Sequence, residues 1–271
     1  MTWLGLIVGN SRFHWAVFQA DQLRQRWDTP HCSETQLREL QRHGFSPEYW
    51  QGLGIQAAQE RIVIDAAQPE LWAASVVEGA LAGLETYSGL EVVQKHKVNL
   101  KGLYETLGID RALSLLGAGE VYGWPVLVVD CGTALTFTAG VKPVSENAGY
   151  LLGGAILPGL SIQFRVLHDY TDRLPWVDHV DLPWPGRWEM TTEGAIASGI
   201  LHTQLAGIRD FLEDWWLNYP GGKVILTGGD GETIFGFLKH HGPELANPIH
   251  LDPDLMFWGL RTYRQALLKG R

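Results

Sequence analysis

Two stretches of the chain share one pattern, in which an apolar run breaks at a glycine and resumes as a second apolar run. In residues 3–18 the break falls at Gly9 and Asn10, a pair that favours a tight turn between antiparallel strands. In residues 126–137 the break falls at Gly132 and Thr133. Because strand residues alternate between two faces, each stretch predicts a strand, a turn and a returning strand.

The residues between these two stretches mix helical and strand periodicities. The predicted elements are helices over residues 33–43 and 78–86, strands at 61–65, 71–77 and 90–94, and a helix that begins near Asp110. Strands and helices that follow one another in this way favour an α/β domain with a mixed sheet.

The second half of the chain repeats the succession of strands and helices. Gly140 and Gly149 signal another hairpin, and a strand at residues 223–229 ends in a Gly-Gly turn. Helices are predicted over residues 161–168, 192–216 and 252–268. Residues 171–191 are rich in Pro, Trp and Asp, which predicts an extended loop and a candidate lid.

The strand–turn–strand pattern restarts near residue 125, which divides the chain into two predicted lobes, 1–124 and 125–271. We expect the last helix, at about 254–268, to pack back on the first lobe. Two related lobes that each open with a glycine turn suggest a protein that clamps a nucleotide.

Composition narrows the class of protein. The chain has 271 residues, of which 45% are hydrophobic and 19% charged, as expected for a soluble globular protein. The net charge of -9 argues against a nucleic-acid-binding surface, which needs a basic face. The two cysteines imply no disulfide framework. We find no basic leader and no run near the roughly 18 apolar residues that span a bilayer, so we expect a cytoplasmic protein without a membrane partner.

The two glycine turns have a chemistry suited to phosphate. A glycine lets the backbone approach a ligand closely, and successive N–H groups with a hydroxyl donor can hold an anion. The candidate ATP-binding residues of the first turn are Gly9, Asn10, Ser11 and Arg12, and those of the second are Gly132 and Thr133. Plain hairpin turns would have the same sequence, so that alternative stays open.

An ordered set of motifs resembles the type III pantothenate kinases, members of the acetate/sugar kinase–Hsp70–actin superfamily. The set consists of residues 9–11 and 130–136 as phosphate loops, the Gly-x-Asp-Arg segment 108–111, the glycine-rich segment 153–159, the Thr-x-x-Leu-Pro loop 171–175, Thr192, and the turn at 227–229. The resemblance covers nearly the whole chain.

This resemblance implies a fold, an activity and partners. The fold would be α/β, with two ribonuclease-H-like (actin-like ATPase) lobes whose mixed β-sheets are flanked by helices. The activity would be ATP-dependent phosphorylation of pantothenate to 4'-phosphopantothenate, the first step of coenzyme A biosynthesis. It also implies ATP as a substrate, Mg²⁺ and a monovalent cation such as K⁺ or NH₄⁺ as cofactors, and a homodimer with the active site at its interface.

The Gly-x-Asp-Arg segment carries the expected catalytic chemistry. Asp110 would act as the general base that accepts the hydroxyl proton of pantothenate, and Arg111 would orient the substrate with its forked donors. Gly108 and Ile109 complete the substrate-binding segment. Asp110 could instead be a simple helix cap, and Arg111 a surface ion-pair partner.

Three other positions are expected to bind ligands. Tyr104 is a candidate for the pantothenate pocket, with core packing as its alternative. By the resemblance, Thr192 would reach the site of the neighbouring subunit, whereas a plain helix cap is the other interpretation. Gly228 and Gly229 would face the nucleoside.

The match fails at two positions where the family carries an aspartate. This chain has Ile7 two residues before the first glycine and Thr138 after the second loop. Both changes remove negative charge from the expected Mg²⁺ region. Asp130 remains, and the resemblance implies that it binds the monovalent cation or takes over part of the Mg²⁺ role.

Two other functions stay open. The first is a kinase or phosphatase for another small hydroxylated metabolite. The second is a non-catalytic regulatory protein that kept the fold, which the loss of acids at Ile7 and Thr138 would favour.

Overall fold

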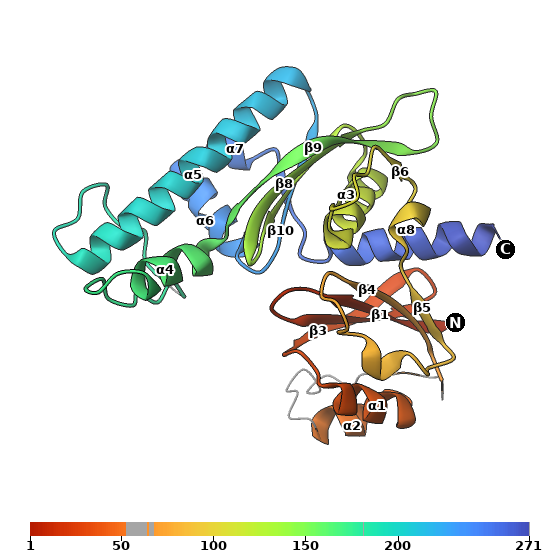
Figure 1. The fold of residues 1–271 in the computed structure, drawn as a ribbon. Coiled ribbons are helices and arrows are strands. Elements are labelled where there is room, and N and C mark those ends of the chain that lie inside the picture. The colour runs from red at the N-terminus through yellow and green to blue at the C-terminus, as the bar shows by residue number, and fades with distance from the viewer. Residues whose placement is uncertain (53–63, 65–67, 181, 271) are drawn as a thin grey trace. The chain divides into compact units, whose positions relative to one another are not determined.

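The computed structural model describes residues 1–52, 64, 68–180 and 182–270. The chain forms two compact units (Figure 1): the first consists of Met1–Gly117 with Met256–Arg271, and the second of Ala118–Leu255. The strand predicted for residues 61–65 lies outside the described residues except for Ile64. Each unit is described here by itself.

The sheet of the first unit has the strand order β3-β2-β1-β4-β5. Its strands are β1 (Thr2–Val8), β2 (Phe13–Gln19), β3 (Gln22–Thr29), β4 (Glu70–Ser75) and β5 (Leu90–Val92). β1 is antiparallel to β2 and parallel to β4, so the sheet is mixed. The hairpin predicted for residues 3–18 and the strands predicted near 71–77 and 90–94 are therefore confirmed.

One face of this sheet packs against two helices, α1 (Glu34–Arg42) and α2 (Pro47–Gly52), as Figure 1 shows. The Ser33 side chain accepts from the Gln36 backbone and the Gln36 side chain from the Ser33 backbone, a capping box that starts α1. Burial of the apolar face of α1 then holds the helix on the sheet. The buried residues include Leu37, Leu40 and Trp50 from the helices and Leu4, Leu6 and Trp15 from the sheet.

The helix predicted for residues 78–86 is wrong. The structure has turns there and a short 3-10 helix, η2 (Ala82–Leu84). Gly79 has a φ of +71°, in the left-handed region that interrupts a helix. Gly83 lies so close to the Glu34 carbonyl and the Leu37 side chain that a Cβ would collide with both. Contact with α1 has therefore overridden the local periodicity.

The other side of the first unit involves α3 (Ile109–Tyr122) and α8 (Leu255–Lys269), both close to their predicted positions. Gly259 of α8 lies directly against the Leu113 carbonyl of α3, where a side chain would not fit. Arg264 of α8 forms an ion pair with Glu70 at 2.7 Å and lies over the Trp3 ring, 4.9 Å from its centroid. The short elements η3 (Lys95–Lys97) and β6 (Leu100–Lys101) lead towards α3.

The strands of the second unit follow the order β11-β10-β7-β8-β9. They are β7 (Val126–Cys131), β8 (Ala134–Val141), β9 (Gly149–Pro158), β10 (Lys223–Thr227) and β11 (Ile249–Leu251). β7 is antiparallel to β8 and parallel to β10, which repeats the pattern of β1 with β2 and β4. The second predicted hairpin is thus confirmed, as is the α/β class with mixed sheets.

Four helices complete the described part of this unit: α4 (Leu160–Asp169), α5 (Thr192–Asn218), α6 (Gly231–His241) and α7 (Pro243–Ala246). The helices predicted for 161–168 and 192–216 are confirmed as α4 and α5. The long helix α5 runs beside the sheet in Figure 1, and its Ile208 and Leu212 pack with Val129 and Leu226 of the strands. Residues 171–180 and 182–191 are largely without regular structure, as predicted.

Candidate functional site

The first glycine turn lies between β1 and β2. The Gly9 N–H donates to the Arg12 carbonyl at 3.0 Å, which closes the turn. Asn10, Ser11 and Arg12 are exposed, while the strand residues on either side, Val8 and Phe13, are buried. The turn therefore presents backbone and polar side chains to its surroundings from a rigid base.

Two further side chains, Asp28 near the end of β3 and His31 just after this strand, contact residues of this turn, and the sequence analysis did not find them. A ring nitrogen of His31 lies 2.9 Å from the Gly9 carbonyl oxygen. Asp28 accepts a hydrogen bond from His14 at 2.8 Å and lies 3.9 Å from the Arg12 guanidinium. Partial burial acts to raise the pKa of Asp28, but His14, Arg12 and Arg26 lower it below its ordinary value.

The second glycine turn lies between β7 and β8 and is packed tightly. The Gly132 N–H donates to the Ala134 carbonyl at 3.2 Å, and the Thr133 carbonyl accepts from Gly159 at 3.0 Å. Gly159 itself has no room for a side chain, because the Gly132 carbonyl occupies the position of its Cβ. Gly159 thus holds the backbone of the turn in place.

The Gly-Gly turn after β10 lies beside the end of β7. Gly228 has a φ of +90°, and a Cβ on it would collide with the Asp130 carboxylate and the Cys131 backbone. The N–H of Asp230 donates to the Cys131 carbonyl at 2.8 Å. Within the second unit, the structure therefore brings together the predicted residues Asp130, Gly132 and Gly228, while a Cβ on Gly229 would point into open space.

Acidic groups dominate this end of the second sheet. Burial raises the pKa of Asp230, although the charge of His179 opposes this. Burial, with the charges of Asp130 and Asp230, also raises the pKa of the Cys131 thiol. Cys131 is 1% exposed, so it is a protonated core residue.

The Gly-x-Asp-Arg segment, which is predicted to bind substrate, forms a compact cluster at the beginning of α3. Asp110 accepts a hydrogen bond from the Arg111 N–H at 2.7 Å through Oδ1. A Cβ on Gly108 would collide with the same oxygen, so glycine is required for this position of the carboxylate. Arg111 donates to the Tyr104 hydroxyl at 3.0 Å. The structure therefore brings Tyr104, Gly108, Asp110 and Arg111 together, with the half-buried Ile109 among them.

The exposure of Arg111 and of Tyr104 tests the alternative interpretations of these two residues. Arg111 is only 7% exposed, so its interpretation as a surface ion-pair partner is wrong. Tyr104 is 44% exposed, so core packing does not explain it either. Asp110 is the second residue of α3 and accepts from the N–H of the next residue, whereas a helix cap precedes the helix and accepts from an N–H two or three residues on. Burial raises its pKa, against the opposing effect of Arg111, which moves the carboxyl towards the range of a general base.

Lys95 is a further residue that the sequence analysis missed. Its ammonium group donates to the carbonyls of Leu107 at 3.0 Å and Tyr104 at 3.4 Å, and also to that of Glu105. These bonds hold the chain that leads into Gly108 and Asp110. The sequence gave no sign of this role of Lys95, because the contacts are to backbone atoms.

Thr192 is the first residue of α5, in the second unit. The cap of this helix is Thr191, whose hydroxyl accepts from the Gly194 N–H at 3.1 Å, so the cap interpretation of Thr192 is wrong. Thr192 is exposed, and Trp188 and Met190 nearby are 90% and 98% exposed. A large exposed apolar surface of this kind is typical of an interaction site.

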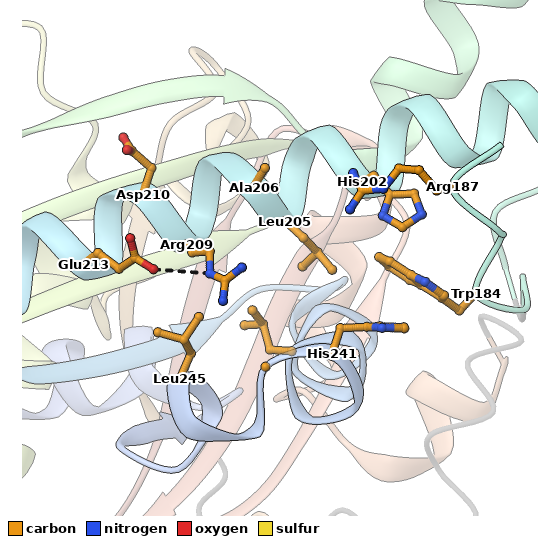
Figure 2. A pocket seen from close by; sticks show the side chains of 12 residues that line it. Trp184, Arg187, His202, Leu205, Ala206, Arg209, Asp210, Glu213, His241 and Leu245 are labelled. Carbon is orange, nitrogen blue, oxygen red and sulfur yellow. Dashed lines mark ion pairs between the residues drawn. The ribbon is translucent and has the colours of Figure 1, made fainter.

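A cavity of about 370 Å³ lies elsewhere in the second unit, beside α5 and α6 (Figure 2). Trp184 lines it, with its ring centroid 4.0 Å from that of His241 and 4.5 Å from that of His202. Arg209 in its wall is balanced by Glu213 at 3.2 Å and Glu244 at 3.6 Å. None of the predicted site residues lines this cavity.

The described residues offer no ready-made metal centre, since no three His, Cys, Asp or Glu side chains among them are placed to hold one ion. Ile7 and Thr138, where the family carries aspartates, are each 1% exposed. In the described part of the chain, no helix combines the length and apolar character needed to cross a membrane.

Solved structures share this fold, in which mixed sheets are flanked by helices. A Baf family transcriptional activator from Campylobacter jejuni aligns with a TM-score of 0.61 at 17% identity, over 98% of this chain and 99% of that one. An activator of 2-hydroxyisocaproyl-CoA dehydratase from Clostridium difficile, solved with ADPNP, aligns with a TM-score of 0.54 at 9% identity, over 100% and 97% of the two chains.

Sequence comparison identifies the family. The family model of type III pantothenate kinase matches residues 3–214. A type III pantothenate kinase from Nostoc sp. is 39% identical over 266 residues, which cover 96% of this chain and 93% of that protein. The chain belongs to the type III pantothenate kinase family.

Proposed function

We propose that this protein transfers the γ-phosphoryl group of ATP to the primary alcohol of pantothenate, in the first step of coenzyme A biosynthesis. Family membership supports the reaction. The observation that carries the proposal is the cluster of Asp110, Arg111 and Tyr104, in which a buried acid adjoins a buried guanidinium. An acid for the hydroxyl and a cation for the carboxylate match the two polar ends of pantothenate.

Asp110 acts as the general base in this proposal. Its carboxylate accepts the proton of the pantothenate hydroxyl as the oxygen attacks the γ-phosphorus. The bond from the γ-phosphorus to the bridging oxygen breaks, and ADP leaves with the electron pair. The raised pKa of Asp110 makes it a stronger base than an exposed aspartate, since desolvation disfavours its charge.

Arg111 and Tyr104 position the substrate. The guanidinium is buried and already ordered by its bond to the Tyr104 hydroxyl, so little entropy is lost when it binds a carboxylate or amide oxygen. Gly108 and Ile109 contribute backbone groups that face the substrate. Lys95 holds the preceding chain through its carbonyls.

Each unit supplies one phosphate-binding turn. In the first unit, Gly9, Asn10, Ser11 and Arg12 bind phosphate oxygens through backbone N–H groups, a hydroxyl and a guanidinium. In the second unit, Gly132 and Thr133 do the same, and Gly228 with Gly229 faces the nucleoside. Phosphoryl transfer depends mainly on such positioning and charge stabilisation.

Two cations belong to this proposal. Mg²⁺ arrives on the ATP phosphates, because the described residues contain no acidic cluster to hold it and Ile7 and Thr138 replace the family's aspartates. A monovalent cation, K⁺ or NH₄⁺, binds at Asp130, whose carboxylate lies beside the backbone of Cys131 and Gly228. A carboxylate with carbonyl oxygens suits a hard cation, which would offset phosphate charge when bound.

We also propose a homodimer in the cytoplasm, with the active site completed at the subunit interface. Thr192 reaches the neighbouring subunit's pantothenate, and the exposed side chains of Trp188 and Met190 become buried between subunits. Their 90% and 98% exposure in a single chain supports this assignment.

A coupled assay of ADP release, with and without pantothenate, tests the proposed function. Pantothenate-dependent release is the expected result. Release with other alcohols alone would instead indicate a kinase for another metabolite, and no release with any alcohol would indicate a non-catalytic protein. Asp110→Asn is expected to lower kcat by about 10²–10⁴-fold, the range for loss of a general base.

A further inference from the structure

The chain that leaves β3 runs alongside the first phosphate turn. In the register of β2 and β3, Phe13 pairs with Thr29 and His14 with Asp28. Because Phe13 is the first residue of β2, the residues after Thr29 continue past the beginning of β2, towards residues 9–12. His31 reaches the turn in this way, and its ring lies 5.1 Å from the Phe13 ring, centroid to centroid.

The hydrogen bond from His31 fixes one peptide group of the turn. The Gly9 carbonyl oxygen can only accept, so the ring nitrogen at 2.9 Å must carry the proton. The cis peptide bond in the described part of the chain is Trp124–Pro125, so the Gly9–Asn10 peptide is trans. In a trans peptide the C=O and the N–H point in opposite directions. A carbonyl held by His31 therefore directs the Asn10 N–H away from His31.

Asp28 contacts the turn at its other end. One carboxylate oxygen bonds His14 at 2.8 Å and the other lies 3.9 Å from Arg12. His14 thus orients the carboxylate, and the carboxylate attracts the Arg12 guanidinium, whose side chain is 66% exposed. The lowered pKa of Asp28 keeps the group anionic at neutral pH.

We propose that His31 and Asp28 are positioning residues for the first phosphate turn. His31 presents the Asn10 N–H, and Asp28 presents the Arg12 guanidinium, to the phosphates of a nucleoside triphosphate. This proposal rests on the proposed function of the turn as a phosphate site. It assigns no contact with ATP to either residue.

The consequences should be specific to the nucleotide. His31 and Asp28 act on the turn in the first unit, while pantothenate is assigned to the segment at the beginning of α3. Loss of one ordinary hydrogen bond in a positioning role corresponds to about a 3- to 10-fold change in binding. We expect the KM and the Kd for ATP to rise by that factor, with the KM for pantothenate unchanged.

The test compares four variants with the wild type by steady-state kinetics and by calorimetric titration with ATP. His31→Ala removes the donor, His31→Gln retains an N–H donor at a similar distance from the backbone, and Asp28→Asn removes the charge. His96→Ala is the control, because His96 is an exposed histidine of η3 in the same unit. A melting temperature for each variant separates misfolding from a loss of positioning.

We expect weaker ATP binding in His31→Ala and Asp28→Asn, and wild-type behaviour in His31→Gln and His96→Ala. Unchanged ATP binding in His31→Ala would overturn the proposal for His31, as would an equal loss in His31→Gln. An equal rise in both KM values would indicate a merely structural role and overturn the proposal as well.

Failure of the proposed function gives a different result. A wild type that binds ATP but does not phosphorylate pantothenate would refute the kinase assignment, and the titrations would still decide the roles of His31 and Asp28. A wild type that binds no ATP would overturn both.

Discussion

Adding one methyl group at Gly108 provides a direct test of the position of Asp110. The Cβ of an alanine at this position would lie far inside van der Waals contact with the Asp110 Oδ1 atom. Gly108 does not have a positive φ, so alanine can adopt its backbone without strain. The carboxylate must therefore move away, and its 2.7 Å bond from the Arg111 N–H is lost.

The expected effects on activity and on stability differ in size. Displacement of a catalytic group by about 1 Å costs on the order of 10²-fold in rate. We therefore expect kcat of Gly108→Ala to fall about 10²-fold, with the KM for ATP unchanged. Loss of a hydrogen bond to a charged group costs about 1.5–3 kcal/mol, and the lower entropy of the unfolded chain returns about 0.4–1 kcal/mol. The net loss of unfolding free energy is then about 1–2 kcal/mol.

A double-mutant cycle with ADP release as the readout decides the cause. If Gly108→Ala acts by displacing the base, it should lower kcat little further in an Asp110→Asn background, because the base is already lost. Gly52→Ala is the control, since its Cβ would meet nothing within 4 Å. Fully multiplicative losses in the double variant, or a normal kcat in Gly108→Ala, would refute the role given to Asp110.

Three further changes test other parts of the structure. Burial raises the pKa of Asp110, and a general base must be deprotonated, so kcat should fall as the pH drops through that raised pKa. The pH–rate profile of Asp110→Asn should lack this fall in kcat at low pH. Lys95→Met removes the donor to the Leu107 and Tyr104 carbonyls, so the KM for pantothenate should rise about 3- to 10-fold in saturation kinetics. An unchanged KM would count against the role of Lys95 in holding the chain before Gly108. Ile7→Asp places an acid at a site that is 1% exposed, so thermal melts should show that the unfolding free energy falls by about 2–4 kcal/mol at neutral pH. The decrease should be smaller in acid, because the buried carboxyl is then neutral. An equal decrease at both pH values would contradict this reasoning.

The elements that local chemistry determines could be predicted from the sequence. The Gly9–Asn10 pair predicted the hairpin because two-residue turns of this type need such residues. The helix at 78–86 failed for a non-local reason, since Gly83 is pressed against Glu34 and Leu37, residues far earlier in the chain. Periodicity contains no information about such contacts.

The candidate site shows the same division between local and distant contacts. Asp110 and Arg111 are neighbours in the sequence, so their segment could be recognised as a unit. His31 and Asp28 meet the first turn only through the register of β2 and β3, which shifts at a bulge between Val17 and Phe18. A slip of one residue would place every side chain of β3 on the opposite face, so no reading of the sequence alone could pair His31 with Gly9.

The charges around the two proposed phosphate turns differ, and this bears on the missing aspartates. The first turn carries the Arg12 guanidinium, which lies 3.9 Å from Asp28, and Asp28 also bonds His14. The second turn lies beside the Asp130 and Asp230 carboxylates, whose charges both act on Cys131. A guanidinium attracts a triphosphate, whereas carboxylates repel it. We therefore expect the second turn to depend on a bound cation more than the first, where Arg12 contributes a positive charge and Ile7 stands in place of an acid.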